Sequence, residues 1–258
     1  MACRAHECSR GDQHGLGPTA PAGAVSGREA SICQALWVGE EFGGDKKHGQ
    51  SFLGPVERRF IDWAVPKLPQ WLRSWQLTLM TIGWSTGMVG FGYLAHDNRV
   101  WLWAMSVMVF GQWLTDSFDG TLGRTRGEGL VKWGYFMDHF LDTIFAGSVV
   151  IGYSLLAPSG TGFLFSLLLL VTMAMMALSF LSFAATNQFQ IAHHGIGPTE
   201  IRIGYIALNT LVFFTGTTIF WWGVPLVLAL NVVVMVGLVW QTHKTLWAID
   251  KAALADKA

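Results

Sequence analysis

Four aspartates stand out because they interrupt stretches of the sequence that are otherwise mostly apolar. Asp116 and Asp119 are three residues apart, and Asp138 and Asp142 are four residues apart. Spacings of three and four place side chains on one face of an α-helix, so the members of each pair are expected to point the same way. Ionisable groups are costly inside apolar helices and are therefore candidates for function.

The charge of these four residues suggests which chemistry they serve. Four carboxylates that converge in a site of low dielectric constant repel one another. Basic side chains could compensate, but the helix expected around Asp138 and Asp142 has none on that face. Two divalent cations would cancel four negative charges, and Mg²⁺ and Mn²⁺ prefer oxygen ligands. Because Mg²⁺ often completes its coordination with substrate phosphates, the pattern predicts a two-metal site that handles a phosphate ester.

Two glycines and an arginine accompany the acids. Gly120 directly follows Asp119, and Gly134 lies one helical turn before Asp138. A glycine leaves room for a ligand or another helix to approach the backbone closely. Arg124 lies between the two acid pairs, and a guanidinium group suits bidentate pairing with a phosphate.

The elements that carry these residues are expected to be membrane helices. Only 13% of the residues are charged, and residues 74–96, 143–199 and 203–243 contain no Asp, Glu, Lys or Arg. About 18 apolar residues are enough to indicate a membrane span. We therefore predict an all-α integral membrane protein. Its six transmembrane helices are placed near residues 76–95, 100–119, 131–156, 161–187, 203–222 and 224–247.

Four regions are predicted along the chain. Residues 1–54 hold all three cysteines without C-x-x-C spacing, and they are expected to be a disordered cytoplasmic tail with no disulfide framework or zinc site. Residues 55–75 combine basic side chains with tryptophans, which predicts an amphipathic segment at the membrane surface, broken at its prolines. Residues 76–247 form the six-helix catalytic domain, and residues 248–258 form a cytoplasmic C-terminal tail.

The basic residues predict the orientation of these helices. With six spans, 16 of the 17 Lys and Arg residues fall on one side of the membrane, and only Arg99 falls on the other. The positive-inside rule then places both termini and the active site in the cytoplasm. The formal net charge of zero argues against a nucleic-acid partner held by phosphate neutralisation.

Residues 116–142 read DSFDGTLGRTRGEGLVKWGYFMDHFLD. This segment resembles the signature of the CDP-alcohol phosphotransferase family, also called the CDP-alcohol phosphatidyltransferase family: D-x-x-D-G-x-x-A-R, about eight residues, then G-x-x-x-D-x-x-x-D. Gly123 stands where alanine is usual, and nine residues separate Arg124 from Gly134. Both departures fall in or beside the loop between the acid pairs. The predicted helices and surface segment also resemble the family's architecture over roughly residues 55–247.

This resemblance implies a role for each matched residue. Asp116, Asp119 and Asp138 would be the principal metal ligands, and Asp142 would complete the metal site and act as general base on the incoming hydroxyl. Asp119, Gly120 and Arg124 would help to hold the CDP moiety, with Arg124 on its phosphates. The implied substrate-binding residues are Asp119, Gly120, Arg124 and Gly134.

The implied reaction moves a substituted phosphate group from a CDP-linked donor to an alcohol acceptor and releases CMP. CDP-diacylglycerol is the expected donor, and two Mg²⁺ or Mn²⁺ ions are the expected cofactors. Transfer from CDP-choline or CDP-ethanolamine to diacylglycerol is the alternative. The resemblance also implies a homodimer.

A later loop offers two further candidates. Residues 193–203 read HHGIGPTEIRI, and the G-P-x-E string is similar to a segment in choline and ethanolamine phosphotransferases. Glu200 and Arg202 could therefore contact the polar group of the acceptor. Equally, Pro198 and Glu200 suit the first turn of a helix, where proline fits and a carboxylate favours the helix dipole.

Two other kinds of membrane protein, prenyltransferases and cation-coupled transporters, also place acidic residues in apolar helices. Membrane prenyltransferases also use aspartate-rich helices and Mg²⁺, but they are expected to carry a second such motif, and residues 143–199 contain no acid. A cation-coupled transporter would be expected to show two related halves with interrupted helices, and no such repeat is apparent in the sequence.

Overall fold

The computed structural model describes residues 52–186 and 197–255. These residues belong to one compact unit, Gly43–Ala258. The predicted tail at 1–54 therefore lies almost wholly outside the described residues, as do residues 193–196 of the later loop and residues 256–258.

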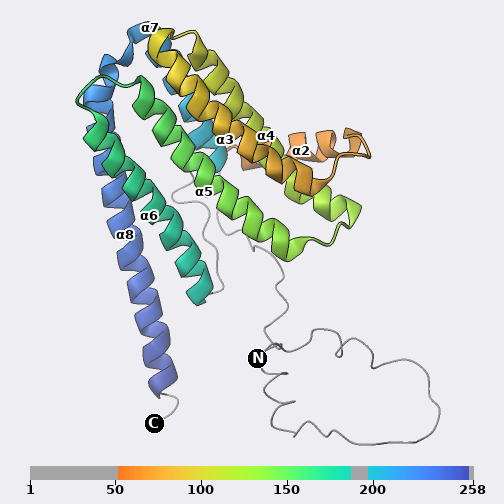
Figure 1. The fold of residues 1–258 in the computed structure, drawn as a ribbon. Helices are drawn as coiled ribbons and strands as arrows, with labels where there is room; N and C mark the ends of the chain where they lie inside the picture. Colours follow the sequence, from red (N-terminus) through yellow and green to blue (C-terminus); the bar gives the residue numbers. More distant parts are fainter. Residues whose placement is uncertain (1–51, 187–196, 256–258) are drawn as a thin grey trace, which may run out of the picture. The chain divides into compact units, whose positions relative to one another are not determined.

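The described residues form helices and contain no strand, which confirms the all-α prediction for them (Figure 1). Two short 3₁₀ turns, η1 (Val65–Lys67) and η2 (Thr217–Ile219), adjoin the longer helices. The α-helices are α2 (Gly54–Ala64), α3 (Ser74–Asp97), α4 (Trp101–Arg126), α5 (Val131–Leu156), α6 (Gly162–Thr186), α7 (Pro198–Thr215) and α8 (Phe220–Ala255).

Three segments are long and apolar enough to cross a membrane: Val131–Leu156, Gly162–Ala185 and Thr217–Ala255. The other long helices, α3, α4 and α7, occupy the regions in which further spans were predicted. Charged residues make two of these helices less apolar: Asp116 and Asp119 in α4, and Glu200 and Arg202 in α7. The six-span arrangement and the cytoplasmic position of the termini therefore remain predictions.

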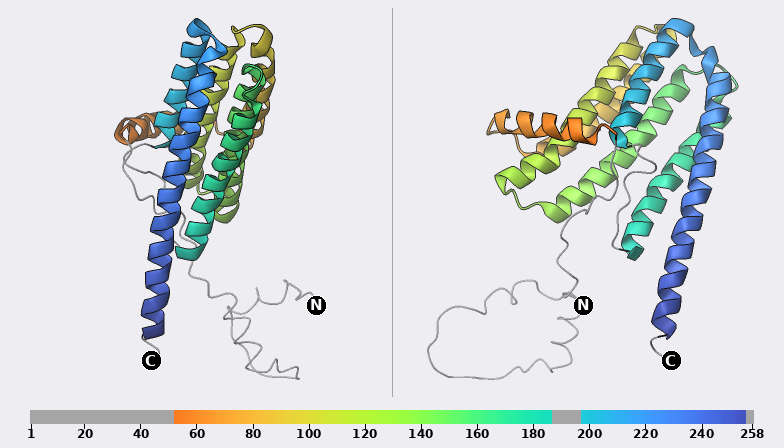
Figure 2. Two further views of the ribbon diagram at one scale, coloured as in Figure 1. Left: turned by 90° about the vertical axis from the view of Figure 1, so that its left-hand side faces the viewer. Right: turned by 180° about the vertical axis from the view of Figure 1, so that it is seen from behind.

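The surface segment predicted at 55–75 has its last two residues in α3 and overlaps the short helix α2, which begins one residue earlier at Gly54. This helix ends at Ala64, and the following turn η1 contains Pro66, which fits the expected break at a proline. Figure 2 shows α2 running across the other helices rather than along them. Its position at a lipid surface remains a prediction.

The last two helices separate earlier than the sequence suggested. The predicted break lay at 222–225, but α7 ends at Thr215 and the chain turns at Gly216, whose φ is +88°. That left-handed backbone favours glycine. Pro225 instead lies within α8, where its ring removes a single helical hydrogen bond, a loss that membrane helices tolerate.

The close approach of α3 and α5 depends on two glycines. α3 packs against both α4 and α5. A Cβ atom built on Gly92 would lie 2.5 Å from the carbonyl oxygen of Gly152, and one built on Gly152 would lie 2.8 Å from that of Met88. These backbones could not approach so closely if side chains stood between them.

A buried polar network joins α4, α5 and α7 beneath the acidic residues. The Tyr153 hydroxyl donates to Oδ1 of Asn209 at 2.8 Å, and Nδ2 of Asn209 donates to the Ser106 hydroxyl at 3.0 Å. All three side chains are buried. Because a buried polar group is costly without its partner, this network favours one register of α7 on its neighbours.

The turn after α4 brings the two acid pairs back toward each other. Gly127 has a φ of +62°, its N–H donates to the Arg124 carbonyl at 3.3 Å, and the N–H of Glu128 donates to the Gly123 carbonyl at 3.1 Å. These two bonds form a Schellman motif, which ends a helix at a left-handed residue. α5 then begins at Val131, packs against α3, and carries Asp138 and Asp142 back toward Asp116 of α4.

Candidate functional site

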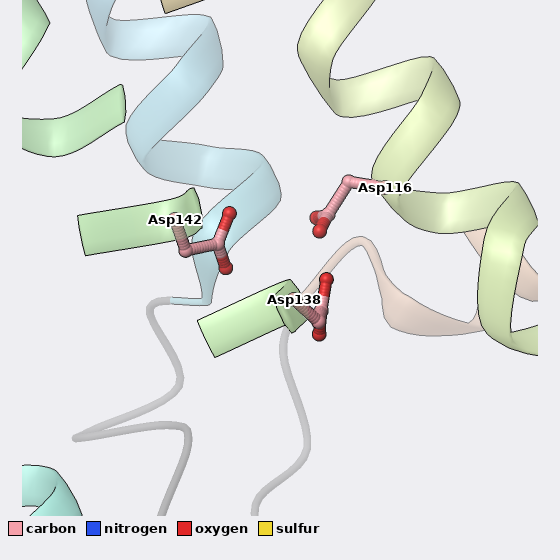
Figure 3. Close-up of side chains that lie close together, drawn as sticks. All are labelled: Asp116, Asp138 and Asp142. Atoms are coloured by element: carbon pink, nitrogen blue, oxygen red, sulfur yellow. The ribbon is translucent and has the colours of Figure 1, made fainter. Parts of the chain in front are cut away.

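Three of the four predicted acids meet in space. One carboxylate oxygen each from Asp116, Asp138 and Asp142 can be chosen so that all three lie within 4.8 Å of one another. Asp116 comes from α4, and Asp138 and Asp142 come from successive turns of α5 (Figure 3). The three carboxylates are half-buried. The helical spacing therefore brings them together in the described structure, and we call these three residues the acid cluster.

The acid cluster fits a divalent ion. Oxygen ligands lie about 2.0–2.1 Å from Mg²⁺ and about 2.3–2.6 Å from Ca²⁺, so two oxygens on one ion are at most about 4.2 Å apart for Mg²⁺ and about 5 Å apart for Ca²⁺. The three oxygens lie within 4.8 Å of one another, which is within the Ca²⁺ limit and somewhat above the Mg²⁺ limit. Carboxylates are also the ligands that Mg²⁺ and Mn²⁺ prefer.

Arg202 supplies a positive charge to the acid cluster. Its Nη2 donates to Oδ2 of Asp116 at 2.8 Å and lies 3.7 Å from Oδ1 of Asp142. The expectation that no basic side chain compensates the acids holds for α5 itself but not for its neighbours, because Arg202 reaches them from α7. The predicted acceptor contact at Arg202 would thus lie beside the acids.

Gln112 connects this arginine with the acid cluster. Its Oε1 accepts a hydrogen bond from Nε of Arg202 at 2.7 Å, and its Nε2 donates to Oδ1 of Asp142 at 2.9 Å. Gln112 is fully buried. It lies in α4 one turn before Asp116, and that spacing of four within an apolar helix is a signal from which it could have been identified.

Asp119 does not join the acid cluster. It is buried, and its Oδ2 accepts a hydrogen bond of 2.6 Å from the hydroxyl of Thr78 in α3. The spacing of Asp116 and Asp119 correctly gave a shared region of α4, but it gave no information on which neighbouring helix offers a hydroxyl. Sequence reasoning missed Thr78 for the same reason.

The two glycines differ in their surroundings. A Cβ atom on Gly120 would lie 3.4 Å from Nη1 of Arg124, which is an ordinary contact distance, so the guanidinium of Arg124 lies against the backbone of Gly120. Arg124 is exposed, and its Nη2 donates to the Thr121 hydroxyl at 3.2 Å. Around Gly134, no atom lies within 4 Å of the Cβ position, so the space expected one turn before Asp138 is present.

Glu200 occupies the first turn of α7 and accepts two backbone hydrogen bonds. Its Oε2 accepts from the N–H of Gly197 at 2.9 Å, and its Oε1 accepts from the N–H of Leu53 at 2.9 Å. These bonds match the helix-start role that the sequence also allowed. Contact between Glu200 and an acceptor remains a prediction.

A second glutamate, Glu57, links α2 to α4 and to α7. Oε1 of Glu57 accepts from the Ser117 hydroxyl at 3.0 Å, and its Oε2 accepts from the Thr199 hydroxyl at 2.7 Å. Ser117 adjoins Asp116 in α4, and Thr199 lies three residues before Arg202 in α7. The short helix α2 is therefore linked to both helices whose side chains form the Asp116–Arg202 pair.

One known protein family matches most of this chain. Residues 71–248 match the family described as CDP-alcohol phosphatidyltransferase. The matched range includes the acid cluster, Gln112 and Arg202, and it covers more than half of the 258 residues. No match was found among curated proteins. The match over residues 71–248, together with the acid cluster inside it, shows that the chain belongs to the CDP-alcohol phosphatidyltransferase family.

Proposed function

We propose that this protein transfers a phosphatidyl group from CDP-diacylglycerol to the hydroxyl group of an alcohol and releases CMP. Membership of the family implies phosphatidyl transfer from a CDP-alcohol. The observation that carries the more specific proposal is the acid cluster, which gathers three carboxylates from two helices within 4.8 Å. Such a cluster suits a reaction in which diphosphate oxygens and divalent ions share one site.

Divalent ions would be held by Asp116, Asp138 and Asp142. A second ion would also call on Asp119, which would then share its oxygens with Thr78. When bound, Mg²⁺ or Mn²⁺ supplies positive charge that polarises the diphosphate and offsets the charge on the departing CMP. Arg202 adds a fixed positive charge 2.8 Å from Oδ2 of Asp116.

The chain's own residues would divide the remaining tasks. The alcohol oxygen forms a bond to the phosphorus that carries the diacylglycerol, and the bond from that phosphorus to the oxygen of CMP breaks. Asp142 takes the proton of the alcohol, because a carboxylate at the reacting hydroxyl can act as general base. Arg124 and Gly120 would hold the CDP phosphates, and the open space beside Gly134 would admit the donor.

The acceptor would enter beside Arg202. The guanidinium of Arg202 is directed at Asp116 and Asp142, so a phosphate or another anionic group on the alcohol could pair with it close to the proposed base. Glu200 precedes Arg202 by two residues in α7, and side chains at that spacing do not face each other, so Glu200 would contact a different part of such an acceptor. An alcohol that carries a phosphate is therefore the acceptor class that we favour.

CMP release from defined donors tests the proposal. The purified protein, in mixed micelles with Mg²⁺, is given CDP-diacylglycerol with inositol phosphate, glycerol phosphate, serine or choline. The reverse panel supplies CDP-choline or CDP-ethanolamine with diacylglycerol. We expect CMP only with CDP-diacylglycerol and most of it with a phosphorylated alcohol. Release only in the reverse panel would replace this proposal with aminoalcohol transfer, and no CMP in either panel would reject both.

Two variants test the assignment of roles. Asp142→Asn should lower the rate of CMP release about 10²- to 10⁴-fold, the range for loss of a general base. Asp138→Asn should abolish turnover while leaving a folded protein that can be extracted. Asp97→Asn is the matched control, because Asp97 is an exposed aspartate at the end of α3. Activity retained in Asp138→Asn would contradict its role as a ligand.

A further inference from the structure

Gln112 is a buried side chain that contacts both Asp142 of the acid cluster and Arg202 beside it. It has no exposed surface, and each end of its carboxamide has a partner. Oε1 accepts from Nε of Arg202 at 2.7 Å, and Nε2 donates to Oδ1 of Asp142 at 2.9 Å. Arg202 belongs to α7 and Asp142 to α5, so this one amide of α4 joins three helices.

The two partners determine which way the amide faces. A guanidinium N–H can only donate and an ionised carboxylate can only accept. If the amide were turned over, two donors would face each other at Arg202 and two acceptors would face each other at Asp142. The observed orientation is therefore the one in which both contacts are favourable, and a fully buried amide has no water to replace either of them.

The contact also distinguishes the two carboxylate oxygens of Asp142, because both Gln112 and Arg202 lie near the same one. Oδ1 receives the hydrogen bond from Gln112 and is the oxygen that lies 3.7 Å from Arg202. Two groups on Oδ1 restrict the rotation of the Asp142 side chain, and Oδ2 is the oxygen without a bond to Gln112. Arg202 is fixed similarly, because Nε is held by Gln112 while Nη2 is held by Asp116.

We propose that Gln112 is a positioning residue that holds Asp142 and Arg202 in a fixed relation, so that the base and the acceptor-binding arginine face the same substrate. This inference rests on the proposed function for the roles of Asp142 and Arg202. Gln112 acts through these two residues and makes no contact with the reacting atoms. Side chains that orient the ligands of a metal site in this way are typically worth about 10- to 100-fold in metal affinity or activity.

Two substitutions separate the two ends of the amide. Gln112→Leu removes both hydrogen bonds and keeps a side chain of similar length. Gln112→Glu keeps an acceptor for Arg202 but places a negative charge against Oδ1 of Asp142. We expect both variants to lower kcat for CMP release about 10- to 100-fold. Only Gln112→Leu should also raise the KM for the alcohol, because only that variant releases Arg202.

The matched control lies on the same pair of helices. Ser106→Ala removes the bond between Ser106 of α4 and Asn209 of α7 and does not touch the acid cluster. We expect its kcat and KM to stay within about twofold of wild type, as its bond lies away from the reacting groups. A loss of activity in Ser106→Ala equal to that of Gln112→Leu would show that general contact between α4 and α7 explains the effect, which would overturn the proposal.

A second readout does not depend on catalysis. Mn²⁺ affinity, measured by electron paramagnetic resonance on the purified protein, should fall about tenfold or more in Gln112→Leu and stay unchanged in Ser106→Ala. If wild type released no CMP, the proposed function would fail while this measurement still tested Gln112. Wild-type kcat and Mn²⁺ affinity in Gln112→Leu, or equal KM values in Gln112→Leu and Gln112→Glu, would overturn the proposal.

Discussion

Nη2 of Arg202 lies 2.8 Å from Oδ2 of Asp116 and so joins the N-terminal part of α7 to the second half of α4. Both side chains are at least partly buried, which strengthens their attraction compared with a pair at the surface. Arg202 would be a permanent cation next to the carboxylates that are proposed to bind exchangeable ones. Its substitution should therefore affect both substrate and metal.

We expect Arg202→Lys to weaken the acceptor site although the charge is retained. A lysine cannot reproduce the two-pronged contact of Nε with Gln112 and Nη2 with Asp116. Loss of one hydrogen bond to a charged group is worth about 1.5–3 kcal/mol, or about 10- to 150-fold in the KM for the alcohol. Steady-state CMP release at varied acceptor concentration measures it. Arg58→Lys, at an exposed position of α2, is the control and should leave KM unchanged.

Divalent ions should raise the melting temperature of the protein through the acid cluster. A ligand at 100 times its dissociation constant stabilises a folded protein by about 2.7 kcal/mol. For a chain of this size, each kcal/mol corresponds to about 2–4 °C. Scanning fluorimetry with and without Mn²⁺ should therefore show a shift of about 5–10 °C, and chelation should remove both this shift and CMP release.

Asp138→Asn gives that experiment its internal check. The variant should lose the shift caused by Mn²⁺, because it lacks one of the three carboxylates of the acid cluster. In the absence of metal, it should melt at or above the wild-type temperature, since neutralising one of several like charges relieves repulsion. A full Mn²⁺ shift in Asp138→Asn would place the ion elsewhere.

Glu200→Gln should lower the melting temperature of the protein. Both oxygens of Glu200 accept backbone N–H groups, from Gly197 and Leu53, and an amide can satisfy only one of these donors with its oxygen. An unsatisfied donor costs about 1–3 kcal/mol. The acceptor KM decides the other predicted role. A rise beyond that of the control Asp62→Asn, at an exposed position of α2, supports acceptor contact, and an unchanged KM argues against it.

The contact between α3 and α5 allows a test with two neighbouring glycines. Gly92→Ala should destabilise the protein by about 1–3 kcal/mol, because the new Cβ would lie 2.5 Å from the carbonyl oxygen of Gly152. Gly90→Ala, two residues earlier in α3, meets no atom within 4 Å and should be neutral or stabilising, since alanine favours helices. Chemical unfolding in detergent compares them. Equal stability of the two variants would contradict the close approach of the helices.

Much of the site could be predicted from local spacing. Asp138 and Asp142 are four residues apart, and this spacing places both side chains on one face of α5, toward Asp116. Arg202, Thr78 and Glu57 come from other helices far along the chain. Their contacts depend on which helices are neighbours, and the period of one helix carries no such information.

Helix boundaries show the same division between local and distant information. The predicted break at 222–225 contains Gly223 and Pro225. In the structure, the conformation of Gly216 makes the turn, and Pro225 continues in α8. A proline removes one hydrogen bond, which its surroundings can replace, whereas a left-handed residue changes the direction of the chain. The sequence does not show which of the two glycine-containing sites adopts that conformation.

The length of α8 has a practical consequence. Its 36 residues rise to about 54 Å, but the hydrocarbon layer is only about 30 Å thick. Tilts of membrane helices rarely exceed about 40°, so a membrane-crossing α8 must extend at least about three turns beyond the hydrocarbon layer. A soluble helical protein fused after Ala255 so that its first helix continues α8 would be held in a fixed orientation relative to α8. It would give a 28.4 kDa chain a visible landmark outside the micelle for electron cryomicroscopy.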